Sequence, residues 1–498
     1  MRVYETREMN LEALSTGEKL WIYNGLDCCI THEVLDALLP QLNQTTNATY
    51  AFSRALQGPI LEMNMRGLRV DAERRDQVLN QYHADMLRLG IQLDHIVRDG
   101  VGSLTWKGID SWRSNTQLCA LLYDELGLPE QKKRQAQGES KRTANRDALD
   151  ALVGYLVAEP IIRHVWALRD LGKKISFLST EIDSDSRLRT SFNIAGTTTG
   201  RLSSSYSDFG SGTNLQNVEN LLRSVFVSDP GYKFCNIDLE QGDSRGVGAI
   251  HWQLFRDGRY LDACESGDLH TAVARGAFPH LQWTGDPARD RQIANGSFHR
   301  TFSYRDAAKR LGHGTNYQGQ PDKMARATHV PLPSVKAFQE AYLNEFTAFP
   351  LWWRWVEEVL RATHKITTLL GRQRHFFGSW KDPETIRQAI AYEPQSITAD
   401  TIDRGLLRLW REAPAYDAQL LLQVHDSILF QFPEAIEDRV VPWALDCIQQ
   451  TVALKGGRSF CIPGEAKVGW NWSDDRSDPD ALRKYTDTTR SLKRERTI

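Results

Sequence analysis

The sequence predicts an α+β protein in which helical segments alternate along the chain with the strands of an antiparallel sheet. Residues 232–237 form a short, mostly apolar run that ends at Asp238, as expected for a buried strand. Two more apolar runs, residues 420–424 and 428–432, flank the triplet His425-Asp426-Ser427. A polar triplet between two apolar runs predicts a tight hairpin with an acidic tip. We therefore expect the sheet to take strands from the middle and from the end of the chain.

Helical spacing of apolar residues covers most of the remaining chain. Residues 51–180 show it clearly, because Leu79, Tyr82, Met86 and Leu89 recur at steps of three and four, and residues 250–365 return to the same periodicity. Residues 1–42 are also expected to be mostly helical, whereas the polar run 43–49 is expected to be a linker. The resulting order indicates a sheet that receives strands from both sides of an inserted helical segment.

Length and composition exclude several classes of protein. At about 150 residues per domain, 498 residues suggest roughly three structural units, and 41% hydrophobic residues exclude a mainly disordered chain. The seven cysteines are scattered and without CxxC spacing, which indicates a reducing compartment rather than a disulfide scaffold or a zinc site. Without an apolar leader or an apolar run of about 18 residues, we expect a soluble, cytoplasmic protein that does not cross a membrane.

The formal net charge is only −2, from 61 Lys and Arg against 63 Asp and Glu. A nucleic-acid-binding protein is usually more basic, unless its positive charge is concentrated locally. The run Lys132–Arg146 holds six basic residues and one acidic residue, and fits either a solvated loop or a mobile loop that grips a phosphate backbone. A second basic cluster lies near the C-terminus and consists of Arg483, Lys484, Arg490, Lys493, Arg494 and Arg496.

Asp238 and Asp426 each stand at the end of an expected strand, almost two hundred residues apart. A lone Asp in such a place is commonly a turn former. Two of them on one sheet could instead hold two hard cations through their oxygens. Paired metal ions stabilise the attacking and leaving oxygens of a phosphoryl displacement. The two aspartates are therefore candidate metal ligands.

A second constellation lies on an expected helix, where Arg305, Lys309, His313 and Tyr317 follow one another at steps of four. Side chains at this spacing share one face of a helix. Two cations and two rings on one face suit the phosphates and the base of a nucleoside triphosphate. The alternative is a solvated basic helix. Gly312 and Gly314 lower helix propensity, and we interpret them as room for a substrate to approach.

Several segments, in order, resemble the motifs of family A DNA polymerases. They are Leu56–Asp71, Thr199–Ser204, Asn214–Asn217, Asp238–Arg245, Arg305–Tyr317, Leu370–Arg374, Pro394–Asp400 and Gln423–Asp426. One such motif carries little information, whereas the ordered set covers nearly all of residues 50–498. The resemblance implies a right-hand polymerase fold with an antiparallel-sheet palm, a helical thumb and helical fingers.

The resemblance also implies a division of the chain and a partner set. The implied segments are an exonuclease-like remnant (1–46), the thumb (47–190), the first part of the palm (191–253), the fingers (254–365) and the second part of the palm (366–498). The implied partners are primer–template DNA, dNTPs and accessory replication proteins. The near-zero net charge then reads as an average of an acidic metal site and basic DNA-binding surfaces.

Individual roles follow from the resemblance position by position. Asp238 and Asp426, with the main-chain oxygen of Leu239, would bind two Mg²⁺ ions, and Lys309 would donate a proton to the pyrophosphate leaving group. Residues that would contact the incoming nucleotide are Arg305, Lys309, His313, Tyr317, His270, Gln241 and Asp243. Residues that would contact the primer–template are Arg201, Gln216, Arg245, Gln395 and His425.

Five positions depart from the pattern of the family. Asp243 stands where a Glu normally acts as a steric gate against a ribose 2′-OH, and Gly242 replaces a bulky apolar residue, which we expect to leave room near the nascent pair. His313 replaces an aromatic residue, Gln318 replaces a Gly, and Ser427 replaces an acid. We expect these changes to shift nucleotide preference rather than to abolish synthesis.

The N-terminal segment resembles the last motif of a proofreading exonuclease at Tyr23, Asp27 and Thr31. That chemistry needs several carboxylates around two metal ions, and no Asp precedes Asp27. We therefore expect a structural remnant or a truncation without proofreading.

The leading hypothesis is a template-directed DNA polymerase, of a phage type, that adds deoxynucleotides to a primer by two-metal phosphoryl transfer. A single-subunit RNA polymerase is one alternative, although the carboxylate of Asp243 argues against it. An inactive DNA-binding protein on a polymerase fold is another, although Asp238, Asp426 and Lys309 are all retained.

Overall fold

The computed structural model describes residues 10–134, 138–299 and 302–486. The chain divides into two compact units, each built from two segments. One unit, which we call the sheet unit, comprises residues 58–245 and 398–498, and the other, the helical unit, comprises residues 1–57 and 246–397. Most of the helical unit is thus inserted in the sequence of the sheet unit, as the alternation of helical and strand patterns predicted.

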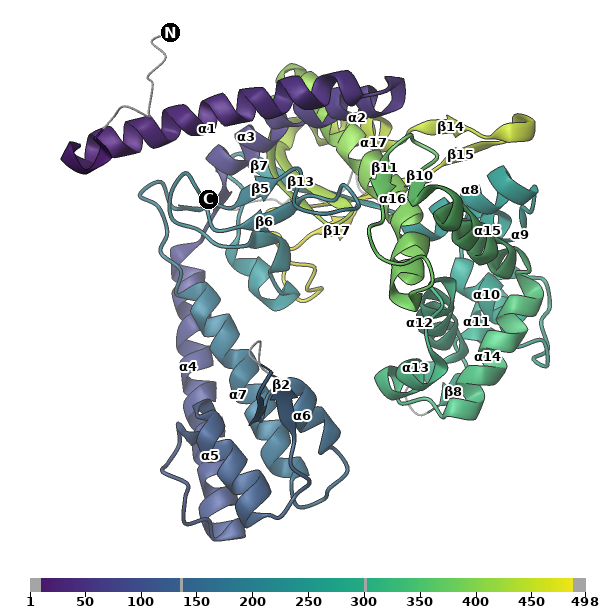
Figure 1. Cartoon of the computed structure of the whole chain (residues 1–498). Coiled ribbons are helices and arrows are strands. Elements are labelled where there is room, and N and C mark those ends of the chain that lie inside the picture. The colour runs from purple at the N-terminus through teal and green to yellow at the C-terminus, as the bar shows by residue number, and fades with distance from the viewer. Residues whose placement is uncertain (1–9, 135–137, 300–301, 487–498) are drawn as a thin grey trace. The chain divides into compact units, whose positions relative to one another are not determined.

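The sheet unit contains a five-stranded antiparallel sheet in the order β12-β13-β7-β16-β17 (Figure 1). Its strands are β7 (Tyr232–Leu239), β12 (Gln419–Val424), β13 (Ser427–Pro433), β16 (Gly464–Gly469) and β17 (Arg483–Lys484). The strand and the hairpin that the sequence predicted are β7 and the β12–β13 pair. Because β7 is central, its residues meet the hairpin on one side and β16 on the other. The α+β class is confirmed.

Helices and short strand pairs complete this unit. The helices are α3 (Gln57–Arg66), α4 (Ala72–His95), α5 (Asn115–Cys119), α6 (Arg146–Ala151), α7 (Glu159–Leu178) and α17 (Glu437–Ile448). The strand pairs are β1 (Leu68–Arg69) with β4 (Arg187–Leu188), β2 (Lys132–Arg134) with β3 (Ser140–Arg142), β5 (Ser191–Asn193) with β6 (Ser203–Ser205), and β14 (Thr451–Ala453) with β15 (Ser459–Cys461).

The long helices α4 and α7 pack on a core of their own, which includes Leu93, Val97, Val165 and Leu168. Asp71 begins α4, because its carboxylate accepts a hydrogen bond from the Arg74 amide at 3.0 Å. The basic run between them contains the exposed β2–β3 hairpin, of which residues 135–137 lie outside the described part of the chain. In the C-terminal basic cluster, only Arg483 and Lys484 are described.

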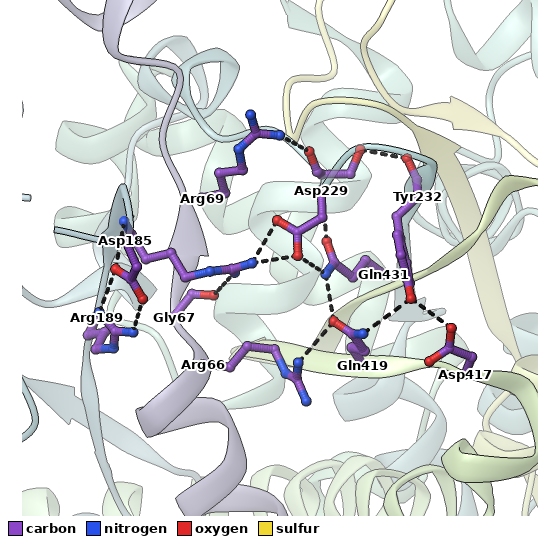
Figure 2. A network of polar contacts seen from close by, with 12 residues as sticks. Arg66, Gly67, Arg69, Asp185, Arg189, Asp229, Tyr232, Asp417, Gln419 and Gln431 are labelled. Carbon is purple, nitrogen blue, oxygen red and sulfur yellow. Dashed lines mark hydrogen bonds and ion pairs between the residues drawn. The ribbon is translucent and has the colours of Figure 1, made fainter. Parts of the chain in front are cut away.

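A polar network ties the helical part of this unit to the sheet at the start of β7 (Figure 2). The Arg187 guanidinium donates to both oxygens of Asp229, one of them at 2.6 Å. Gln431 on β13 also donates to Asp229, at 2.7 Å, and donates to Gln419 at 2.8 Å. Arg66, the last residue of α3, reaches Gln419 at 2.9 Å. The network therefore fixes the sheet at the strand ends opposite to Asp238.

The helical unit is built mainly of helices. They are α1 (Thr16–Leu38), α2 (Gln44–Ala55), α9 (Arg259–Glu265), α10 (Leu269–Ala277), α11 (Pro287–Ala294), α12 (Tyr304–Asn316), α13 (Pro321–Thr328), α14 (Leu332–Glu345) and α15 (Ala348–Thr363). Its strand pairs are β8 (Ser297–His299) with β9 (Phe302–Ser303), and β10 (Lys365–Thr367) with β11 (Gln373–His375). Two helices, α8 (Gly242–Phe255) and α16 (Pro383–Glu412), run from one unit into the other.

The expected linker at residues 43–49 is wrong, because these residues begin α2. Asn43 caps that helix: its side chain accepts from the Thr46 amide, and the Thr46 hydroxyl accepts from the Asn43 amide, both at 2.9 Å. The polar residues at the start of this run thus form a capping box and not a loop.

Among the described residues, no helix combines the length and the apolar character needed to span a bilayer.

Candidate active site

Asp238, on β7, lies beside the turn of the neighbouring β12–β13 hairpin, and that turn carries Asp426. Asp238 is the residue of β7 that pairs with Ser427, the first residue of β13. Asp426 immediately precedes Ser427, and its main-chain oxygen accepts from the Leu239 amide at 3.0 Å. The hairpin thus brings together two carboxylates that the sequence separates.

The two carboxylates repel each other's charge. The Asp238 side chain reaches solvent, but the protein atoms packed around it and the nearby Asp426 raise its pKa to about 7. The pKa of Asp426 is also raised, first by burial and then by the charge of Asp243. Two carboxylates that lie close together without enough nearby positive charge attract a cation, and hard divalent cations prefer carboxylate oxygens as ligands. The pair therefore fits Mg²⁺.

The described residues contain no group of three His, Cys, Asp or Glu side chains already arranged around a metal position. A cation at the aspartate pair would therefore need main-chain, water or substrate oxygens as further ligands.

Asp243, in the first turn of α8, is held on two sides. The Thr398 hydroxyl donates to Asp243 Oδ1 at 2.7 Å, and Arg201 Nη2 donates to the same oxygen at 3.2 Å. The room expected at Gly242 is not there: a Cβ at Gly242 would lie 2.7 Å from Thr398 Cγ2. The threonine methyl occupies the space that the missing side chain leaves.

Buried amides support the aspartate hairpin. Gln216 follows Asn214 in a short 3₁₀ turn (Leu215–Asn217) and is only 8% exposed. Its side chain donates to the main-chain and side-chain oxygens of Gln423, each at 3.1 Å. The Gln216 side chain is thus buried and hydrogen-bonded to Gln423 rather than exposed on a surface.

The turn itself has an unusual backbone. His425 is exposed and has a φ of 56°, in the left-handed region that non-glycine residues rarely adopt. Gln423 Nε2 donates at close range to the His425 oxygen, and the Ser427 hydroxyl donates to the Val424 oxygen at 2.9 Å. Ser427, which stands where the family has an acid, closes the turn.

Two more predicted residues lie where β7 leads into α8. Gln241 has a φ of 57°, and its side-chain oxygen is buried without a hydrogen-bond partner among the described residues. Arg245 is only 7% exposed, so little of its guanidinium surface is displayed.

In the helical unit, α12 carries the predicted cationic face. Its first turn is capped by Ser303, whose hydroxyl accepts from the Asp306 amide at 3.0 Å. Arg305 Nη2 donates to Asp268 Oδ1 at 3.0 Å, and Arg305 Nε donates to the same oxygen at 3.2 Å. Asp268, the N-cap of α10, thus fixes the direction of the Arg305 side chain.

His270 and Lys309 differ in exposure. His270, in the first turn of α10, is half-buried, and burial together with the charges of Arg305 and Lys309 lowers its pKa to about 4. Lys309 is exposed. The rings of His313 and Tyr317 are 5.2 Å apart in an edge-to-face arrangement. Arg305, Lys309 and His313 therefore line one helix, as their spacing predicted, and Tyr317 follows its last turn.

Asn316 holds the end of α12 through three buried contacts. Its amide donates to the Tyr260 hydroxyl at 2.9 Å, its side-chain oxygen accepts from the Tyr342 hydroxyl at 2.6 Å, and its main-chain oxygen accepts from Trp353 Nε1 at 3.1 Å. The chain then turns at Gln318, whose φ of 56° is one that a glycine would adopt without strain.

The two glycines of α12 serve internal packing. A Cβ at Gly314 would lie 2.9 Å from Met324 Cε, and one at Gly312 would lie 3.5 Å from the Tyr342 ring. The interpretation of Gly314 as room for substrate is therefore wrong, because that space belongs to a neighbouring helix.

The basic residues near α6 border a cavity of about 560 Å³. Its lining residues are Asn115, Asn145, Arg146, Trp166, Arg169, Asp170 and Lys173. The Arg146 guanidinium lies 4.2 Å from the centre of the Trp166 ring. Three cations against one carboxylate make the cavity positive. Gln395 lies elsewhere, partly exposed on α16.

Sequence reasoning missed Thr398, Asp268, Gln423 and Asn316. Thr398, Gln423 and Asn316 lie inside three of the motif segments, and Asp268 lies two positions before His270, a predicted nucleotide contact. The absent side chain at Gly242 was the one signal that a neighbour fills the space, and no feature within the segment Arg305–Tyr317 marked Asn316 as a support of the helix end.

The comparisons agree with this geometry. Residues 108–474 match the model of DNA polymerase family A. The thermostable DNA polymerase I of Thermus aquaticus is 27% identical in an alignment of 384 residues that covers 72% of this chain and 40% of the relative. The DNA polymerase I of Helicobacter pylori strain J99 is 25% identical in an alignment of 395 residues that covers 75% of this chain and 38% of the relative. The chain thus spans about 40% of the length of these relatives.

A solved structure shares the fold. It is the POL domain of Pol1 from M. smegmatis in complex with DNA primer-template and dNTP. The match has a TM-score of 0.66 and 25% identity, and covers 84% of this chain and 69% of the other. The chain belongs to DNA polymerase family A.

Proposed function

We propose that the chain is a template-directed DNA polymerase that adds deoxynucleotides to the 3′-OH of a primer. The observation that carries this proposal is that β7 and the neighbouring β12–β13 turn bring Asp238 and Asp426 together in a family A chain. The named relatives are DNA polymerases, and the M. smegmatis domain was solved with primer-template and dNTP. We extend these substrates to this chain.

Asp238, Asp426 and the main-chain oxygen of Leu239 would hold two Mg²⁺ ions. The ions, when bound, stabilise negative charge on the attacking and leaving oxygens of the displacement. The contribution of the chain is to fix one carboxylate on β7 and the other in the adjoining hairpin turn, so that no rearrangement of the sheet is needed at the moment of reaction.

The exposed face of α12 would bind the triphosphate. Arg305 is pre-oriented by Asp268, which lowers the cost of ordering its long side chain on a phosphate. Lys309 keeps its ammonium in solvent, where it can donate a proton to the pyrophosphate. His270, neutral because of its lowered pKa, can donate a hydrogen bond to a phosphate oxygen.

The remaining nucleotide contacts follow the family. Tyr317 would lie under the templating base, with His313 beside it. Within the described part of the chain, the Gln241 side-chain oxygen is a buried acceptor without a partner, which suits a donor on the substrate. Asp243 would stand against the 2′ position of the sugar.

Primer–template contacts would come from Arg201, Arg245, Gln395 and His425, and His425 is the most exposed of them. Gln216 would act indirectly by supporting the hairpin. Of the two interpretations of the basic run 132–146, the positive cavity bordered by Arg146 favours a grip on the phosphate backbone. The thumb, palm and fingers would occupy the four segments from residue 47 to residue 498 that the resemblance implied.

We further propose that residues 10–46 supply no proofreading. Asp27 and Tyr23 lie on α1, a helix on which no residue is buried. Thr31 donates its hydroxyl to the Asp27 main-chain oxygen at 2.7 Å, which is a local helix contact. Rapid removal of a mismatched 3′ nucleotide by the purified protein, lost in Asp27→Ala, would contradict this proposal.

An RNA polymerase is disfavoured by Asp243, which is held firmly at the position where a ribonucleotide enzyme needs no gate. An inactive scaffold is disfavoured by the retention of both aspartates and of Lys309. Neither alternative has an observation of its own in its favour.

A primer-extension assay separates the three functions. A 5′-labelled primer is annealed to four templates that differ in the first unpaired base, and each dNTP and rNTP is supplied alone with Mg²⁺. We expect addition of the complementary dNTP on each template. Preferred use of rNTPs, or synthesis without a primer, would indicate an RNA polymerase, and binding without extension would indicate a scaffold.

A further inference from the structure

Thr398, on α16, touches two neighbouring residues of α8 in different ways. Its hydroxyl donates to Asp243 Oδ1 at 2.7 Å, and its methyl group fills the space beside Gly242. We propose that Thr398 is a positioning residue that fixes Asp243 and thereby sets the selectivity between deoxyribonucleotides and ribonucleotides. This inference rests on the polymerase function proposed above.

The Asp243 carboxylate is placed so that its neighbours can fix its orientation. Its side chain is 20% exposed, and two donors, Arg201 and Thr398, converge on Oδ1. Hydrogen bonds to a charged carboxylate are stronger than neutral ones, so together they restrict the rotation of a short side chain. A carboxylate excludes a 2′-OH only while it stays in one place. An Asp at this position therefore needs a partner to hold it.

Gly242 explains why the threonine hydroxyl points toward Asp243. A β-branched side chain has few favourable rotamers on a helix. The Thr398 methyl is accommodated beside Gly242, where a Cβ would lie 2.7 Å from Cγ2 and 2.9 Å from Oγ1. Any larger residue at position 242 would collide with this arrangement. The glycine, the threonine and the aspartate thus form one unit.

The catalytic test measures kcat/KM for a matched dNTP and for the corresponding rNTP. Thr398→Val keeps the shape of the side chain and removes the hydroxyl. We expect the dNTP to rNTP ratio to fall about tenfold, the factor that corresponds to about 1.4 kcal/mol and to one hydrogen bond to a charged group. The change should arise mainly from better use of the rNTP. Thr398→Ser, which restores the hydroxyl, should keep most of the wild-type ratio.

Thr385→Val is the matched control. Thr385 lies on the same helix and donates its hydroxyl to Asp382 Oδ2 at 3.0 Å, so the variant loses a comparable hydrogen bond. The dNTP to rNTP ratio of Thr385→Val should equal that of the wild type. An unchanged ratio in Thr398→Val, or an equal loss in Thr398→Ser and Thr398→Val, would overturn the inference while leaving the polymerase function intact. A wild-type protein that extends no primer would overturn both.

A second test needs no activity. Alanine normally stabilises a helix relative to glycine by up to about 1 kcal/mol. Gly242→Ala should nevertheless lower the melting temperature, because its Cβ meets the Thr398 side chain. The same substitution made together with Thr398→Ala should be neutral or stabilising relative to Thr398→Ala alone. A stabilising effect of Gly242→Ala in the wild-type background would contradict the packing relation.

Discussion

Gln216 donates its side-chain amide to the main-chain and the side-chain oxygens of Gln423, each at 3.1 Å. Gln423 donates in turn to the main-chain oxygen of His425, the residue before Asp426. Because Gln216 and Gln423 are both buried, this chain of amides is shielded from competing water. The position of the hairpin that carries Asp426 is therefore set from inside the protein.

Replacing Gln216 by Leu should destabilise the protein. Leucine has about the size of glutamine, but it cannot donate a hydrogen bond to the Gln423 oxygens. Leaving these oxygens without the Gln216 donor costs about 1–3 kcal/mol. The unfolding free energy measured in urea should fall by this amount. Gln77→Leu is the control, because Gln77 is exposed and donates only to Glu73. Equal stability of the two variants would show that the amide chain contributes nothing.

Asn316→Leu should lower stability and weaken nucleotide binding together. It removes the acceptor of the Tyr342 hydroxyl and the donor to Tyr260, at a cost of about 1–3 kcal/mol. It also loosens the residue that precedes Tyr317, so KM for the dNTP should rise. Melting curves and single-nucleotide insertion measure the two effects. Asn24→Leu, on the exposed helix α1, is the control. If Asn316→Leu is as stable as this control, the role of Asn316 is contradicted.

The sheet and the hairpin could be predicted from sequence because their signals are local. An apolar run that ends in Asp238, and two runs around Asp426, specify strands without reference to any distant residue. The spacing of Arg305, Lys309 and His313 specified a helix face for the same reason.

Contacts through space could not be predicted in this way. Thr398 and Asp243 are separated by 155 positions, and no pattern near either residue names the other. Gln216 matched a DNA-contacting position, but its burial depends on how the 3₁₀ turn packs on β12. The linker expected at residues 43–49 failed because a polar run also suits a helix cap, and local composition does not distinguish the two.

Stability should depend on pH through Glu393. Burial raises the pKa of this carboxyl to about 8, and its Oε2 has no hydrogen-bond partner in the part of the chain that the structure describes. The folded state therefore keeps the proton while the unfolded chain, with the ordinary value of 4.5, releases it. The contribution of Glu393 is fully present below pH 4.5 and is lost as the pH rises toward 8, by up to about 4 kcal/mol.

Glu393→Gln should remove that dependence, since an amide stays neutral. Urea unfolding at pH 5, 6.5 and 8 should show the variant gaining stability over the wild type as the pH rises. Glu340→Gln, at an exposed position, should follow the wild-type curve. Parallel curves for Glu393→Gln and the wild type would refute the assignment.

The ion pair between Arg187 and Asp229 should anchor the far end of the sheet. The two side chains are 16% and 22% exposed, so the pair is shielded more than a surface pair. We expect Arg187→Met to cost about 1–3 kcal/mol, because the Asp229 carboxylate would keep only its hydrogen bond from Gln431. Arg88→Met is the control, because it removes a helix-surface pair with Asp85 at 2.9 Å in which the arginine is 62% exposed. If both variants melt at the wild-type temperature, the network in Figure 2 is not an anchor.

The most direct test of the account is single-turnover incorporation of one matched dNTP by Asp238→Asn and Asp426→Asn. Each change keeps the size of the side chain and removes the negative charge that would hold Mg²⁺. We predict that both variants lose at least about 10³-fold in rate, bind primer–template as the wild type does, and resemble the wild type treated with EDTA. Asp438→Asn, at an exposed position on α17, should incorporate at the wild-type rate. Incorporation by Asp426→Asn at the wild-type rate would contradict the assignment of the aspartate pair as the catalytic metal site.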